Sequence, residues 1–103
     1  MATIKLLGYP SVDQGTEAYA LPADKRGALL AYLALQGTWV RREQLAFLFW
    51  ADTDNSTARA NLRQLLRRTK QLAYTADLHL KSESVFWEVK TDLSRFSKTV
   101  NLK

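Results

Sequence analysis

The sequence contains no cysteine, two prolines and four glycines among its 103 residues. The absence of cysteine excludes disulfide bonds and thiolate metal sites. The scattered glycines form no loop that could cradle a phosphate, and no nucleophile elbow is present. The only histidine, His79, has Asp77 and Glu83 nearby in the sequence. One imidazole without cysteine does not favour a zinc site, so we expect no metal, no cofactor and no enzymatic activity.

Long hydrophobic runs are also absent, since the longest is ALLAYLAL at 28–35. A membrane-spanning helix needs ~20 consecutive apolar residues, so no membrane segment is expected. The N-terminal MATIKLLGYP lacks the architecture of a cleavable signal, which favours a cytoplasmic location. Hydrophobic residues make up 47% and charged residues 24% of the chain, a balance typical of one folded domain with a modest core.

Acidic residues are fewer than basic ones. The chain has 10 aspartates and glutamates and 15 lysines and arginines, which gives a net charge of +5. Such an excess favours polyanionic partners, although it does not determine a fold. The imbalance is greatest in ARANLRQLLRRTKQLA at 58–73, which holds four arginines, one lysine and no acid. Glycine and proline are absent from this segment, so we expect one continuous basic helix.

Hydrophobic periodicity predicts an α+β fold, with an N-terminal sheet, three helices and a hairpin. Two or three short antiparallel strands are expected in the first twenty residues, among them 4–7 and 17–21, with a turn at 13–15. Two more strands are expected as the arms of a hairpin over 77–90. The expected helices are 23–36, 41–50, 55–73 and the start of another helix at 92–100. We expect Gly37 to end the first helix, and Asn55 or Ser56 to cap the third. The three tryptophans, Trp39, Trp50 and Trp87, occupy apolar positions, and core packing is expected for them rather than base stacking.

The third predicted helix has two contrasting faces when its residues are placed at 100° intervals. The side expected to be buried carries Ala58, Leu62, Leu65, Leu66, Thr69 and Ala73. The opposite side carries Ser56, Thr57, Ala60, Arg63, Gln64, Arg67, Arg68 and Gln71, with Arg59 and Lys70 at its edges. No acid lies between residues 55 and 76, so ion pairs within the helix cannot neutralise it. Like-charge neighbours four positions apart destabilise an isolated helix by roughly 0.2–0.5 kcal/mol each.

Two explanations of this basic face remain open. It is either a solvated face paired across space with acids such as Asp52 or Glu43, or a surface for a negative partner. Arginine and glutamine pair with guanine and adenine edges in the major groove of DNA. A basic helix that follows a second helix after a short turn is typical of a helix-turn-helix, and the hairpin after it would supply the wing of a winged helix.

Four separated blocks resemble a known family in order and spacing. They are LPADKRGALLAYLALQG (21–37), VRREQLAFLFWAD (40–52), ARANLRQLLRRTKQLA (58–73) and FWEVKTDLSRF (86–96). They resemble the N-terminal DNA-binding domain of the SARP/AfsR-type bacterial transcriptional activators, which is a winged-helix domain of the OmpR/PhoB type. The resemblance implies a small N-terminal sheet, three helices and a C-terminal wing. The third helix would enter the major groove, and the hairpin tip would touch the adjacent minor groove or backbone.

By this resemblance the chain is a sequence-specific double-stranded DNA-binding domain, with the recognition helix at 56–73. The residues expected to contact base edges, from the middle of the polar face, are Arg63, Gln64 and Arg67. Those expected to contact the DNA backbone are Arg41, Arg42, Ser56, Thr57, Arg59, Arg68, Lys70, Lys81 and Ser82. The loop between the second and third helices would contact RNA polymerase through Asp52, Thr53 and Asp54.

The resemblance also divides the chain into a winged-helix domain at 1–91 and, at 92–103, the start of a following helical domain or a C-terminal tail. A single short recognition helix favours dimers or tandem binding on direct repeats. The chain departs from the family pattern at Arg41, which stands where a serine or threonine usually caps the second helix. The alternative function is a protein-interaction module that docks an acidic partner through the basic helix.

Overall fold

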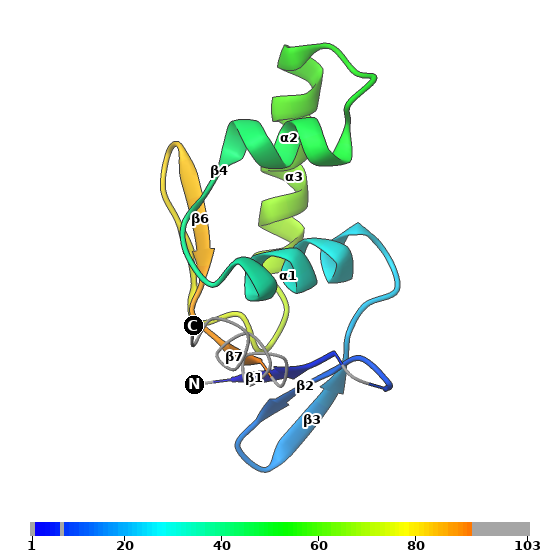
Figure 1. Ribbon diagram of the computed structural model, residues 1–103, viewed down its shortest axis with the longest axis vertical. Coiled ribbons are helices and arrows are strands. Elements are labelled where there is room, and N and C mark those ends of the chain that lie inside the picture. The colour runs from blue at the N-terminus through cyan, green and yellow to red at the C-terminus, as the bar shows by residue number, and fades with distance from the viewer. Residues whose placement is uncertain (1, 7, 92–103) are drawn as a thin grey trace, which may run out of the picture.

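The computed structural model describes residues 2–6 and 8–91, which form an α+β globule with three helices and two small sheets (Figure 1). This confirms the predicted class, while the expected helix at 92–100 lies outside the described residues. The helices are α1 (Lys25–Gln36), α2 (Arg42–Phe49) and α3 (Asn55–Lys70). None of the helices in the described part of the chain has both the length and the apolar character needed to cross a bilayer.

The first sheet has four strands in the order β3-β2-β1-β7. Its strands are β1 (Thr3–Lys5), β2 (Ser11–Gln14), β3 (Glu17–Ala20) and β7 (Lys90–Thr91). The first three pair antiparallel, and the predicted turn places Gly15 at φ 65°, which glycine adopts without steric cost. Strand β7 was not predicted; it pairs parallel to β1 and joins the end of the described chain to its beginning.

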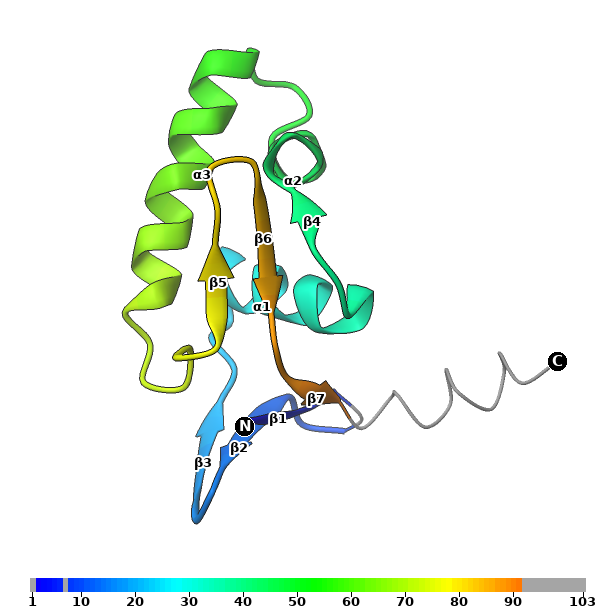
Figure 2. The ribbon, with the colours of Figure 1, turned by 90° about the vertical axis from the view of Figure 1, so that its left-hand side faces the viewer.

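The second sheet has three antiparallel strands in the order β4-β6-β5. Its strands are β4 (Val40–Arg41), β6 (Ser84–Trp87) and β5 (Leu78–Leu80). The predicted hairpin is confirmed as β5 and β6, and Figure 2 shows it standing between α3 and β4. Strand β4 was not predicted: Val40 pairs with the fully buried Val85, and Arg41, expected to begin the second helix, belongs to this strand.

Helix α1 starts two residues later than predicted, because the side chain of Asp24 caps it. The Asp24 carboxylate accepts a hydrogen bond of 2.9 Å from the backbone N–H of Arg26. At the other end Gly37 has a φ of 67°, and its N–H donates to the carbonyl of Leu33. The predicted role of Gly37 is confirmed, since this left-handed cap favours glycine.

Gly27 of α1 packs against the backbone that precedes the helix. A Cβ atom at this position would lie 1.9 Å from the carbonyl oxygen of Pro22, which cannot move without moving the chain. We therefore expect Gly27→Ala to destabilise the protein by ~1–3 kcal/mol, as overpacked cores do, despite the better helix propensity of alanine. Urea denaturation measures the change.

The control for this substitution is Ala28→Gly, at the adjacent exposed position of the same helix. It changes helix propensity without a steric contact and should cost about 1 kcal/mol. A stabilised Gly27→Ala variant would contradict the close approach of α1 to Pro22.

Helix α3 is capped by Asp54, so the prediction of Asn55 or Ser56 as the cap was wrong by one or two residues. The Asp54 carboxylate accepts hydrogen bonds from the backbone N–H of Thr57 at 3.2 Å and from the hydroxyl of Ser56 at 2.8 Å. These bonds hold the pKa of Asp54 below its usual value. The helix ends at Lys70 rather than near residue 73, and Gln71 follows as its C-terminal cap.

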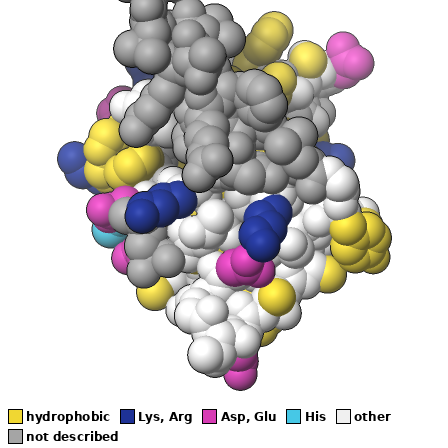
Figure 3. All heavy atoms as spheres, turned by 60° about the horizontal axis from the view of Figure 1, so that its bottom comes forward, with side chains coloured by type: hydrophobic (Ala, Val, Ile, Leu, Met, Phe, Trp, Pro, Cys, Tyr) yellow, Lys and Arg dark blue, Asp and Glu magenta, His cyan; other side chains and the backbone are white. Residues whose placement is uncertain are grey.

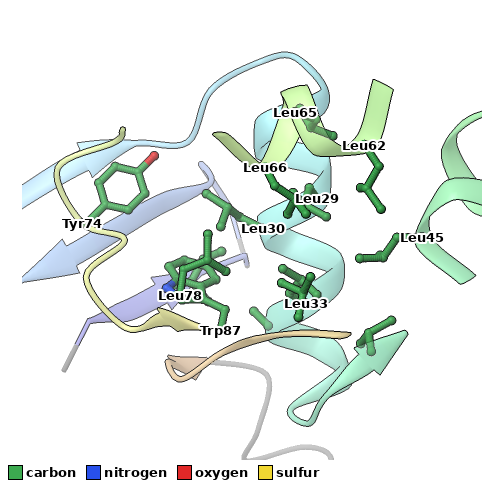
Figure 4. Packing of buried hydrophobic residues seen from close by; sticks show 14 of the residues in the cluster. Leu29, Leu30, Leu33, Leu45, Leu62, Leu65, Leu66, Tyr74, Leu78 and Trp87 are labelled. Carbon is green, nitrogen blue, oxygen red and sulfur yellow. The ribbon is translucent and has the colours of Figure 1, made fainter. Parts of the chain in front are cut away.

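The hydrophobic core lies around α1. Figure 4 shows Leu29, Leu30 and Leu33 of this helix among side chains from the other two helices and the hairpin. The labelled neighbours are Leu62, Leu65 and Leu66 of α3, Leu45 of α2, Leu78 of β5 and Trp87 of β6. Because the apolar stripe of α3 is used in this packing, its opposite face points away from the core.

Candidate nucleic-acid interface

The two predicted faces of α3 are present in the structure. The buried residues of the helix are Ala58, Leu62, Leu65, Leu66 and Thr69, all from the predicted stripe. The hydroxyl of Thr69 donates a 2.7 Å hydrogen bond to the carbonyl of Leu65, which satisfies this polar group inside the core. Ala73 falls beyond the end of the helix and is exposed. On the other face the exposed residues include Arg59, Arg63, Gln64, Arg67 and Arg68.

The four arginines of α3 form no ion pair with any acid among residues 2–6 and 8–91. The ion pairs there join Lys5 to Asp13, Arg26 to Asp24, Arg41 to Glu43 and His79 to Glu88. Glu43, one of the two acids expected to neutralise the helix, contacts Arg41 at 3.4 Å instead. Within the described part of the chain the positive charge of α3 is therefore left for a partner or for solvent.

A hollow of about 700 Å³ lies between α2, the first half of α3 and the hairpin tip. Five of the predicted DNA-contacting residues line it, namely Arg41, Arg42, Arg59, Arg63 and Ser82. The N–H of Arg42 donates a 2.9 Å hydrogen bond to the carbonyl of Glu83, which holds the hairpin tip beside the start of α2. Glu43 and Glu83 also line the hollow, so its lining residues are not all positive or neutral.

Arg42 is half-buried in this region and close to a second cation. Its Nε atom is buried and makes no hydrogen bond to any described residue. Desolvation, and then the charge of Arg63, lower the pKa of Arg42 below its usual value. Two guanidinium groups with an unused donor between α2 and α3 would both be stabilised by a bound anion such as a phosphate.

A second hollow of about 430 Å³ separates the later turns of α3 from the hairpin. Arg42, Arg63 and Arg67 line it together with Lys70 and Leu80. The structure therefore brings two predicted base-contacting residues, Arg63 and Arg67, next to a predicted phosphate contact. The other predicted residues on this face, Gln64 and Arg68, are exposed and line neither hollow.

Lys70 has a structural role that the sequence did not predict. Its ammonium donates hydrogen bonds to the carbonyls of Thr75 at 2.9 Å and Leu78 at 2.8 Å, with Ala76 at 3.4 Å. The lysine thus ties the connection after α3 to the end of the helix, and the buried Thr75 adds hydroxyl bonds to the carbonyls of Lys70 and Leu72. Lys70 is nevertheless exposed and lines the second hollow beside Arg63 and Arg67, so its positive charge remains at this face of α3.

Ser56 and Thr57, which were predicted to contact the DNA backbone, also have hydrogen-bond partners within the chain. The hydroxyl of Ser56 and the N–H of Thr57 both bond to Asp54, whose carboxylate stands at the N-terminus of the helix. A phosphate near Ser56 and Thr57 would be repelled by this carboxylate, whereas Arg59, one turn further along the helix, is exposed.

At the hairpin tip, Lys81 and Ser82 are exposed, as a contact at this position requires. The Lys81 ammonium lies 4.3 Å from the ring centroid of Trp39, a cation–π contact that holds the side chain on the outer side of the sheet. Trp39 is 38% exposed, so its predicted core position was wrong. That prediction was right for Trp87, which is 1% exposed, and Trp50 packs half-buried against the core.

The loop between α2 and α3 presents two acids beside an apolar surface. Asp52 is exposed, Thr53 is half-buried, and Asp54 is the cap of α3. The neighbouring Phe47 is 71% exposed. Exposed aromatic side chains are typical of protein-contact surfaces, and the exposed carboxylates beside this one would repel a nucleic acid.

The far end of the molecule has a different character. Figure 3 shows the face around the first sheet, where the described basic and acidic side chains are interspersed.

Comparison of the chain with protein-family models, with curated proteins and with solved structures gives no match. Function is therefore inferred from the geometry and charge of the residues themselves.

Proposed function

We propose that this chain binds double-stranded DNA sequence-specifically as part of a bacterial transcriptional regulator, probing the major groove with α3. The observation that carries this proposal is the exposed face of α3, whose four arginines have no acidic partner among the described residues. The hairpin of β5 and β6 is the wing of a winged helix in this proposal.

The dimensions of α3 suit the major groove. Sixteen residues at ~1.5 Å per residue make a helix about 24 Å long. Its diameter of ~10–12 Å matches a groove about 12 Å wide. Arg63, Gln64 and Arg67 project from the middle of the exposed face, where a helix in the groove meets base edges. Arginine reads guanine and glutamine reads adenine through bidentate hydrogen bonds.

Phosphate contacts on both sides of the groove would hold α3 in place. Helix α2 begins at Arg42, and Arg41 before it supplies no side-chain cap. The Arg42 N–H bonds to the carbonyl of Glu83, so the N–H groups that follow it in the first turn are the ones available to an anion. Arg41 and Arg42 stand at this helix end, and the hairpin supplies Lys81 and Ser82. Arg59 and Arg68 flank the base-reading residues along α3. Contacts of this kind fix the register of the protein on the duplex but carry no sequence information.

The order of elements supports a regulator of the SARP/AfsR type. A small N-terminal sheet, three helices and a hairpin follow one another as that resemblance implies. In this proposal the protein acts in the bacterial cytoplasm as an activator, and the α2–α3 loop with Phe47 contacts RNA polymerase. Binding to direct repeats, by dimers or tandem copies, would raise the affinity of a single short recognition helix.

Selection of bound duplexes from a random pool at near-physiological salt tests the proposal. We expect an enriched motif, and about five neutralised phosphates predict a log–log salt slope near −4.5 for the selected duplex. Equal binding of all duplexes, with release at moderate salt, would contradict sequence reading. The basic helix would then fit the alternative function of docking an acidic protein.

A further inference from the structure

The outer face of the hairpin gathers three side chains that can bind a metal. In the register of β5 and β6, Leu78 pairs with Trp87 and His79 with Phe86. The next pair is Asp77 and Glu88, joined by a 3.0 Å hydrogen bond from the Glu88 N–H to the Asp77 carbonyl. Leu78 and Trp87 point into the core, so Asp77, His79 and Glu88, one position away, share the opposite face.

The distances between these groups suit a transition-metal ion. One ligand atom each from Asp77, His79 and Glu88 can be chosen so that all three lie within 4.8 Å of one another. The Nε2 atom of His79 lies 3.2 Å from Oε1 of Glu88. Tetrahedral zinc with bonds of ~2.1 Å separates two ligand atoms by about 3.4 Å. The His79–Glu88 pair is therefore almost at ligand spacing, and Asp77 needs a small side-chain rotation.

Two further features favour a cation at this place. Asp77 and Glu88 stand directly opposite each other on neighbouring chain segments, where like charges destabilise a sheet. The imidazole of His79 is packed against Phe86, with ring centroids 6.1 Å apart and an interplanar angle of 25°, and against Trp39 at 6.3 Å. These aromatic neighbours, one on β6 and one just before β4, limit the rotation of the ring, which reduces the entropy lost when it binds an ion.

We propose that Asp77, His79 and Glu88 form a divalent transition-metal site of the zinc type at the base of the hairpin, completed by water. One imidazole and two carboxylates suit zinc, whereas all-oxygen sites suit magnesium and calcium. The ammonium of Lys70, bound to the carbonyl of Leu78, lies near the site and weakens it by repulsion. A weak, exchangeable ion is expected, which would fasten the two hairpin strands together.

The sequence predicted no metal site, and of the two acids near His79 in the sequence only Asp77 belongs to this cluster. Glu83 is only four positions from His79, but it lies at the hairpin tip, where its carbonyl accepts a hydrogen bond from the backbone N–H of Arg42. Glu88 is nine positions away and reaches His79 because the hairpin folds back. A strand register, which the sequence does not specify by residue, decides which carboxylate joins the imidazole.

Equilibrium dialysis of the full chain against zinc chloride, produced without a polyhistidine tag, tests this site. We expect one zinc ion per chain, and no binding of magnesium at the same concentration. His79→Asn, Asp77→Asn and Glu88→Gln should each weaken zinc binding at least tenfold, since even loss of an outer partner of a metal ligand typically costs ~10–100-fold.

The matched control is Glu83→Gln, which removes the same charge from the same hairpin but should leave zinc binding unchanged. Circular dichroism without metal checks that each variant is folded. Failure of the parent chain to bind zinc would overturn the proposal, and so would variants of Asp77, His79 and Glu88 that all bind as the parent does. No DNA enters the experiment, so its result is independent of the proposed DNA-binding function.

Discussion

Replacing both Arg63 and Arg67 by alanine should weaken binding to the selected DNA sequence by ~2–6 kcal/mol and relax its specificity. Each arginine that reads a guanine is worth ~1–3 kcal/mol. Both residues line the same hollow between α3 and the hairpin. Their replacement removes the two guanidinium groups proposed to donate hydrogen bonds to base edges. Competition binding with the selected duplex and single-base variants of it measures affinity and specificity together.

Loss of binding by this double variant would not reflect unfolding. Arg63 and Arg67 are exposed and four positions apart, and Arg63 also repels the half-buried Arg42. Removing them relieves like-charge repulsion, so thermal stability should stay equal or rise. The charge control is Lys25→Ala combined with Lys90→Ala, which removes two exposed charges from α1 and β7. It should keep sequence preference and lose only a small, non-specific part of the affinity.

Single substitutions of Arg59 and Arg68 separate phosphate contacts from base contacts. Each should weaken all duplexes alike and reduce the salt slope by about one. If the Arg63/Arg67 variant retains the parent's affinity and motif, α3 is not the reading element. If it weakens every duplex by the same factor as the charge control, the basic face acts through charge alone.

Local periodicity explains why the helices could be predicted closely. The five helical residues of the predicted stripe of α3 are all buried, namely Ala58, Leu62, Leu65, Leu66 and Thr69. Apolar residues spaced three and four positions apart lie on one helix face, and that face packs against the core. Gly37 was predicted as the end of α1 for an equally local reason, since a left-handed cap favours glycine. The basic residues of α3 are exposed as predicted because their positions lie opposite this stripe.

Features that depend on distant parts of the chain were not predictable in the same way. Strand β7 has two polar residues and no alternation of its own, and it forms by pairing with β1 at the other end of the described chain. The ammonium of Lys70 binds carbonyls five to eight residues later, so its role depends on the path of the connection after α3. Trp39 looked like a core residue, yet β4 leaves it on the outer side of the sheet, against Lys81 and Phe86.

Trp87→Ala should destabilise the protein by ~3–5 kcal/mol, the usual cost of removing a buried tryptophan. Trp87 is 1% exposed, pairs with Leu78 across the hairpin and lies 6.5 Å from the Tyr74 ring. Its loss would open a cavity where the hairpin meets α1, and a small domain has few kcal/mol to spare. Urea denaturation followed by far-UV circular dichroism measures the change without relying on tryptophan fluorescence.

Two controls connect this loss to packing. The indole N–H of Trp87 is buried without a hydrogen-bond partner among the described residues, so Trp87→Phe removes an unsatisfied donor as well as volume. It should therefore cost much less than Trp87→Ala. Trp39 lies just before β4 and is 38% exposed, so Trp39→Ala should cost little stability but release Lys81 at the hairpin tip. Equal losses from Trp39→Ala and Trp87→Ala would contradict the core described around α1, and with it the rigid support that holds α3 outward.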